Sequence, residues 1–499
     1  LDIRDEQGRS LPARVAVLAS DGRAAAPADA WMHADDGFDP ARQSMETQYF
    51  HCASPCTLDA PAGATSVWVQ RGFRFAPWKK SVSVAAGGER MVRVDLKKQD
   101  LPASFGTWRS ADLHVHMNYG GAYRNTPARL AQQARAEDLD VVYNTIVNKE
   151  ERIPDVGYFR PDPDPVSSEG VAIFHAQEYH TSLWGHLGLL HLGDHLLTPD
   201  FSAYQHTALA SPFPHNGAVA DLAHAQGALV GYVHPFDWDI EPAKEKKLSH
   251  MLPADAAHGK VDYIEVVGFA DHKATANVWY RLLNLGFRLP AGAGTDAMAN
   301  YASLRGPVGM NRTFLDTGGE TSPAALREAL KAGRSFASNG PLLGLELAGE
   351  RPGGTVKRSA PGKLAYRIAL RSPVAVDHLE LVHNGRVVKS FKLSGDRRSL
   401  DAEGDLQADA GGWALLRAWN DGADPLVLDL YPYATTSPVY LDTPGGPATA
   451  KEDAAYFAAW MERVLAEAEA RDEYNNEREK RATTDYLRAA LERFRALSR

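Results

Sequence analysis

The chain has 499 residues, 44% hydrophobic and 23% charged, a balance typical of a soluble globular protein of about three domains. Its net charge of −9 and the absence of a long basic run argue against a nucleic-acid partner, and no apolar stretch is long enough to span a membrane. Fourteen of the eighteen histidines fall between His114 and His272, which indicates that the chemistry lies there.

Residues 1–105 are expected to form a β-sandwich. Short alternating runs at 14–18, 66–70 and 90–96 are separated by Gly, Pro and Asp turns. Cys52 and Cys56 are the only cysteines; they could form a disulfide in an exported protein, or remain free thiols. This pair and the β domains favour a periplasmic or secreted location.

Residues 106–341 alternate between strand and helix patterns. Thr126 and Pro127 predict the start of a helix that runs to about Glu137. A buried strand is then expected over 139–148, with further strands at 229–233, 263–267 and 288–295. Helices are expected over 217–227 and 273–285, and from 322 to about 333. Repeated βα units predict parallel strands with helices outside them.

The rest of the chain divides into a second β region and a helical end. Residues 342–445 are expected to form a second β-sandwich, with strands at 364–370 and 378–383 and a hairpin turn after the latter. Residues 446–499 predict charged helices with an apolar stripe that includes Tyr456 and Trp460. Packing onto the protein is the expected role of the stripe, and binding a partner helix is the alternative.

His114 and His116 form the strongest chemical signal. Side chains alternate along a strand, so two histidines one residue apart point to the same face, where imidazoles commonly bind a metal. Glu178, His234 and Asp296 follow at or just beyond other predicted strand ends, and the carboxyl ends of barrel strands share one rim. Together with His186, these residues provide four imidazoles and two carboxylates. One tetrahedral ion needs only four ligands, so the six suit two ions that share a carboxylate.

The ordered motifs resemble the polymerase and histidinol phosphatase (PHP) superfamily over roughly residues 106–341. They are His114-Val-His116, Glu178, Gly185-His186, His234-Pro235 and Gly294-Thr-Asp296. Three longer runs are similar to its carbaryl-hydrolase branch: 114–121, 184–189 and 271–274. The resemblance implies a distorted seven-stranded β/α barrel of the TIM-like type, flanked here by the two sandwiches and the helical segment.

The resemblance also implies the metal ligands. One ion would be held by His114, His116, Glu178 and Asp296, and a second by Glu178, His186 and His234. Superfamily members with three ions carry further histidines where this chain has Lys149 and Met298. We therefore expect two divalent ions, with Lys149 supplying charge in place of a third or serving as a salt-bridged barrel residue. Zinc is the expected metal, with manganese or iron as alternatives.

Other residues near the motifs are candidates for catalysis or substrate contact. Asp296 could accept the proton of the attacking water, while Lys149 and His180 could stabilise the oxyanion or donate a proton. His180 could equally be structural. The candidate substrate-lining residues, each with a purely structural role as its alternative, are Asn118, Tyr123, Arg124, Trp184, Glu265 and His272.

These observations predict a binuclear metal-dependent hydrolase. It would use a metal-bridging hydroxide to cleave a carbamate or carboxylic ester bond in a small-molecule substrate. A phosphoesterase is the first alternative, because the same metal chemistry suits both. A non-catalytic metal-containing binding protein is the second. The oligomeric state is left open, a homo-oligomer included.

Overall fold

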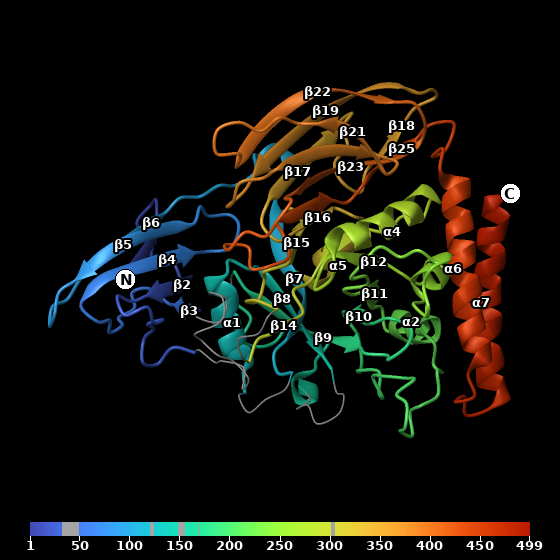
Figure 1. Cartoon of the computed structure of the whole chain (residues 1–499), viewed down its shortest axis with the longest axis horizontal. Helices are drawn as coiled ribbons and strands as arrows, with labels where there is room; N and C mark the ends of the chain where they lie inside the picture. Colours follow the sequence, from blue (N-terminus) through green and yellow to red (C-terminus); the bar gives the residue numbers. More distant parts are fainter. Residues whose placement is uncertain (32–48, 120–123, 148–154, 169, 301–304) are drawn as a thin grey trace.

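The computed structural model describes residues 1–31, 49–119, 124–147, 155–168, 170–300 and 305–499. It shows a mixed α/β protein (Figure 1). The blue N-terminal strands lie at one end, the central strands and helices lie in the middle, and two red helices lie at the opposite end. The orange C-terminal strands cover one side of the central part.

The N-terminal region consists of strands. A four-stranded antiparallel sheet has the order β3-β2-β4-β5, and β1 pairs with β6 in parallel. Alternating apolar residues such as Val15, Val17 and Phe50 face one buried core. Cys52 and Cys56 form a disulfide. The strands are β1 (Asp2–Asp5), β2 (Ala13–Leu18), β3 (Tyr49–Cys52), β4 (Gly63–Gln70), β5 (Trp78–Val84) and β6 (Arg93–Leu96).

The central region alternates strands and helices. Thr126 caps the first helix by accepting a hydrogen bond from the Arg129 amide, as its sequence predicts. The strands are β7 (Trp108–His116), β8 (Val141–Ile146), β9 (Ala172–Tyr179), β10 (Leu187–Leu190), β11 (Leu229–Tyr232), β12 (Tyr263–Val267), β13 (Ala291–Ala293), β14 (Ala297–Met298), β15 (Arg312–Asp316) and β16 (Ser335–Ser338). The α-helices are α1 (Pro127–Ala136), α2 (Asn216–Ala225), α3 (Leu252–Ala257), α4 (His272–Asn284) and α5 (Pro323–Lys331), and short 3-10 helices span Ala103–Phe105 and Asp155–Tyr158.

The central strands form one mixed sheet in the order β13-β12-β11-β10-β9-β8-β7-β15-β16. β7, β8 and β9 are parallel, as are β11, β12 and β13, but β10 is antiparallel to both of its neighbours. β15 is antiparallel to β7 and to β16, so the prediction of parallel strands throughout is wrong at β10, β15 and β16. Only residues 180–186 connect β10 to β9, fewer than a parallel crossover requires.

The two ends of this run of strands also approach each other. Gly294, just after β13, forms a bridge with Arg312 at the start of β15. Nearby, the Ala293 amide donates to Oγ1 of Thr313 at 2.7 Å. β13, the first strand of this order, therefore contacts β15, which pairs directly with β7 at the other end of the run.

The same sheet continues into the C-terminal strands through pairing of β16 with β24. A separate three-stranded sheet, β17-β19-β22, contributes Leu343, Ile368 and Leu406 to a core that it shares with β20 and β23. The strands are β17 (Leu342–Leu347), β18 (Thr355–Lys357), β19 (Gly362–Arg371), β20 (His378–His383), β21 (Arg386–Ser390), β22 (Ser399–Ala408), β23 (Gly412–Trp419), β24 (Tyr433–Thr436) and β25 (Val439–Asp442).

The chain ends in two helices, α6 (Ala450–Ala470) and α7 (Glu477–Ser498), which lie side by side (Figure 1). Trp460 and Val464 of the predicted stripe are fully buried, and Trp460 Nε1 donates to the carbonyl oxygen of His250 at 3.0 Å. The stripe therefore packs on the central region. Among the described residues, no helix combines the length and the apolar character needed to cross a membrane.

Candidate metal centre

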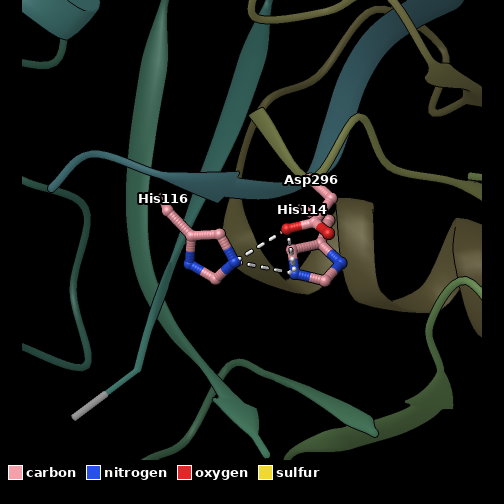
Figure 2. Close-up of side chains that lie close together, drawn as sticks. All are labelled: His114, His116 and Asp296. Carbon is pink, nitrogen blue, oxygen red and sulfur yellow. Dashed lines mark hydrogen bonds and ion pairs between the residues drawn. The ribbon is translucent and has the colours of Figure 1, made fainter. Parts of the chain in front are cut away.

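Three side chains converge at the end of β7 (Figure 2). Nε2 of His114 lies 3.2 Å from Nε2 of His116, so the two imidazoles point to the same place, as strand alternation predicts. Oδ1 of Asp296 lies 2.9 Å from Nε2 of His116 and 3.5 Å from Nε2 of His114. All three residues are almost completely buried. They form a compact triangle of two imidazoles and a carboxylate.

Glu178, near the end of β9, extends this triangle to two more histidines. Its Oε2 atom lies 3.3 Å from Nε2 of His116 and 3.7 Å from Nε2 of His114. Its Oε1 atom lies 2.9 Å from Nδ1 of His186 and 3.3 Å from Nε2 of His234. The two oxygens of one carboxylate thus face two different pairs of imidazoles.

The strand directions explain why these residues meet. His116 and Glu178 lie at the carboxyl ends of parallel strands, and His234 closely follows the end of β11. β10 runs in the opposite direction, so its first residues, next to His186, reach the same rim. Asp296 precedes β14, which pairs with the end of β7. All six predicted ligands are therefore brought to one side of the sheet.

The backbone at the site is irregular. The pairing of β7 with β8 shifts register between Asp112 and Val115, next to His114. His234 and Asp296 adopt φ values of 31° and 57°, in the left-handed region that non-glycine residues rarely occupy. A Cβ at Gly294 would collide with His114, so only glycine allows this approach. Such irregularities are common at functional sites.

Surrounding groups orient the imidazoles. Nδ1 of His116 lies 2.8 Å from the carbonyl oxygen of Thr145, which favours a proton on Nδ1 and leaves Nε2 free to bind an ion. Glu265 is buried beside Nδ1 of His114, at 3.4 Å, and accepts a hydrogen bond from the His234 amide at 3.1 Å. These contacts resemble the outer shell that fixes histidine ligands in metal sites.

The carboxylates and imidazoles shift each other's pKa values. Burial alone would raise the pKa of Glu178, but the facing imidazoles, His114 first, hold it well below its ordinary value. The pKa of Asp296 is likewise lowered: burial alone would raise it, but His114, His116, His234 and Arg305 together outweigh the effect of burial. Both carboxylates are therefore ionised at neutral pH, the form in which they bind metal ions.

The geometry of these side chains fits a metal ion. Bonds of about 2.0–2.1 Å in a tetrahedral site place the ligand atoms about 3.3 Å apart. The sides of the His114–His116–Asp296 triangle measure 3.2, 2.9 and 3.5 Å. Oδ1 of Asp296 and Nδ1 of His186 are buried and make no hydrogen bond in the described structure, although each lies 2.9 Å from an ionisable partner. Atoms that are close together yet not aligned for hydrogen bonding are typical of ligands facing a common centre.

Three overlapping groups of side chains could each hold an ion, because their ligand atoms lie within 4.8 Å of one another. The first is His114, His116 and Asp296, and the second is His114, Glu178 and His234. The third is Glu178, His180 and His186. His180 therefore lies beside the proposed ligands, and its ring centroid is 3.7 Å from that of His186.

The remaining predicted site residues lie in varied settings. Asn118 is buried and bonds to Asp155 and to the backbone of Asn125. Trp184 is fully buried and donates to the Pro212 carbonyl. His272 is buried with Nε2 3.1 Å from Asp429, and Arg124 is exposed. Tyr123 and Lys149 lie outside the described residues.

Two residues at the site had not been singled out from the sequence. Arg305 lies with a guanidinium nitrogen 2.5 Å from Oδ2 of Asp296, and nothing in its local sequence indicates this pairing. Asp112 accepts hydrogen bonds from the amides of His114 and Thr295 and so joins β7 to the Asp296 segment. Asp112 had a signal, because it continues the two-residue spacing of His114 and His116 along the strand.

A scan against protein-family models, a search of curated proteins and a search of solved structures each found no match to this chain.

Proposed function

We propose that the protein is a binuclear metal-dependent hydrolase that cleaves carbamate or carboxylic ester bonds. The observation that carries this proposal is the position of Glu178, whose Oε2 faces one imidazole pair and whose Oε1 faces another. A carboxylate shared in this way suits a pair of ions. The buried histidine and carboxylate donors are ordinary ligands of zinc, with manganese or iron as alternatives.

The proposed ligand sets follow from these contacts. His114, His116 and Asp296 would hold one ion, His186 and His234 the other, and Glu178 both. When bound, two divalent ions would supply a nucleophile from water at neutral pH and positive charge near the substrate carbonyl.

The protein's own groups then have distinct roles. Asp296, ionised and buried, would accept the proton of the attacking water. Arg305 lies close enough to that carboxylate to supply positive charge to the developing oxyanion. Glu265 would keep His114 oriented. Beside the ligands, His180 is the proposed proton donor to the leaving group, and Lys149 is a proposed further source of charge.

We also propose that the central strands close into a distorted (β/α)7 barrel of the PHP type, flanked by two β-sandwiches. The bridge between Gly294 and Arg312 supports closure, because it links the first strand of the run to β15. The shared core of Leu113, Tyr263 and Leu315 supports it too, because Tyr263 comes from β12, which lies far from β7 and β15 in the order of the sheet. In a barrel, ligands far apart in sequence meet at one rim.

The proposed substrate class comes from the likeness of residues 114–121, 184–189 and 271–274 to the carbaryl-hydrolase branch. It is a small molecule with an aryl or oxime leaving group. The bonded pair Cys52–Cys56 supports a periplasmic or secreted location.

A comparison of hydrolysis rates tests this function. The metal-loaded protein should release naphthol from 1-naphthyl carbamate faster than it releases nitrophenol from p-nitrophenyl phosphate. A preference for the phosphate would identify a phosphoesterase instead. Tight metal binding without turnover of either substrate would indicate a binding protein.

A further inference from the structure

A cavity lies on the N-terminal sheet, away from the metal centre. It has a volume of about 520 Å³ and is lined by residues of that sheet and by the C-terminal segment 424–428. Arg14 and Ala16 face it, whereas Val15 and Val17 between and beyond them belong to the hydrophobic core. The cavity therefore lies on the face of the sheet opposite to its core. Its volume is within the range of small-molecule sites, about 300–1,000 Å³.

The floor of the cavity is a row of paired residues across the sheet. Ala16 on β2 pairs with Tyr49 on β3 and with Trp68 on β4, and Trp68 pairs with Lys79 on β5. Directly opposite residues lie about 4.5–5.5 Å apart at their Cβ atoms. A small alanine between two large aromatic side chains leaves a depression with aromatic walls. Trp78 adds another aromatic ring to the lining.

The charges around the depression are mainly positive. Arg14, Lys79 and Arg398 line the cavity, against the single carboxylate of Asp424. In the described parts of the chain, Lys79 and Arg398 form no ion pair, and the Lys79 ammonium lies 4.7 Å from the centroid of the Trp68 ring. This is a locally cationic site on a protein whose net charge is −9.

Arg14 is the buried member of this group. It is 8% exposed, and its Nη1 atom has no hydrogen-bond partner among the described residues. Its Nε atom lies 3.6 Å from Oε1 of the buried Glu137, so the two side chains form an ion pair. Because Nη1 is shielded from solvent, Arg14 contributes positive charge beside the cavity, and the hydrogen bonds to a bound anion would come from Lys79 and Arg398.

Residues 424–428 form the wall of the cavity that faces the sheet, and hydrogen bonds hold this wall in place. Nε2 of Gln70 donates to the carbonyl oxygen of Leu426 at 2.9 Å, which ties the 424–428 segment to β4. Leu428 adopts a φ of 60°, a conformation that persists only where the surroundings fix it. Asp429, the next residue, is anchored to His272 at 3.1 Å. The cavity is therefore preformed.

We propose that this cavity binds a planar aromatic anion, such as an aryl carboxylate. The ring would lie over Ala16 between Tyr49 and Trp68, and the carboxylate would face Arg14, Lys79 and Arg398. This site shares no residue with the metal centre and does not depend on the proposed hydrolase function.

Binding of 1-naphthoate to the full chain, measured by isothermal titration calorimetry, tests the proposal. We expect saturable binding with a Kd below about 1 mM. Arg398→Gln and Lys79→Gln should each weaken it at least about tenfold, because each removes a charge-assisted contact. Ala16→Leu should abolish binding by filling the depression. Arg397→Gln and Lys80→Gln remove neighbouring charges that do not line the cavity and should leave the Kd unchanged.

Two further ligands and one further variant make the test specific. The neutral 1-naphthalenemethanol should bind at least about tenfold more weakly, and maltose should not bind. Asp296→Asn should bind naphthoate like the unmodified chain, because its change lies in the metal centre. Absence of saturable binding, stronger binding of maltose, or loss of binding in Asp296→Asn but not in Arg398→Gln would each overturn the proposal.

Discussion

Oε2 of Glu178 lies 3.3 Å from Nε2 of His116, and its other oxygen, Oε1, lies beside the imidazoles of His186 and His234. One carboxylate therefore connects side chains from the end of β7, from the residue just before β10 and from the segment just after β11. The proposed pair of ions depends on this connection.

Glu178→Gln should lose both ions, since an amide keeps the shape of the side chain but removes the charge that both ions would share. Metal content after dialysis, measured by elemental analysis, tests this. Glu328→Gln makes the same change on the exposed face of α5 and should keep the metal content of the unmodified chain. Two ions retained per chain in Glu178→Gln would refute the bridging role.

Glu265→Gln should weaken metal binding without removing a ligand. Glu265 lies beside Nδ1 of His114 and accepts from the His234 amide, so its charge supports both histidines. Loss of such outer contacts typically reduces metal affinity or activity about 10- to 100-fold. Competition with a chelator measures the affinity, and an unchanged value would show that Glu265 acts only in packing.

Asp296→Asn should remove most of the turnover even at saturating metal. The amide cannot accept the proton of the attacking water, and loss of a general base typically lowers rates about 10²- to 10⁴-fold. Turnover of 1-naphthyl carbamate and circular dichroism together test this, with Asp194→Asn on an exposed loop as the control. Near-normal turnover in a folded Asp296→Asn protein would exclude the proposed role.

Much of the local structure could be predicted from the sequence because its signals are local. The spacing of His114 and His116 predicted their common face, and Thr126-Pro127 predicted the start of α1. Gly286 and Gly333 follow the ends of α4 and α5 with positive φ, as their positions predicted. β12 and β20 lie close to their predicted positions.

Features that depend on distant contacts could not be predicted. A strand pattern is the same whether the strand runs parallel or antiparallel, so the antiparallel directions of β15 and β16 were missed, and the short strand β10 was not predicted. The pairing of Arg305 with Asp296 arises only when two loops meet. Likewise, the pairing of β16 with β24, which joins the central and C-terminal strands in one sheet, has no local signal.

Asp255→Asn should change how stability depends on pH. Asp255 accepts hydrogen bonds from Tyr232 and from Tyr486 on α7, and burial raises its pKa to about 7. The unfolded carboxyl ionises near pH 4, so stability falls as the pH rises from about 4 to 7, by at most about 4 kcal/mol. Asparagine does not ionise, so the Asp255→Asn protein should not show this fall in stability with rising pH.

The melting temperature of Asp255→Asn relative to the unmodified chain should therefore be higher at pH 8 than at pH 5. Asp472→Asn, between α6 and α7, should show no such difference. An equal effect of Asp255→Asn at both pH values would show that the carboxyl is not protonated in the folded protein at pH 5.

The most direct test of the binuclear centre is a metal titration of the chelator-treated protein with zinc, repeated with manganese, while hydrolysis of 1-naphthyl carbamate is followed. The six converging ligands predict that activity is absent without metal and reaches its plateau at two equivalents per chain. A plateau at one or three equivalents, or full activity without added metal, would contradict a two-ion hydrolase.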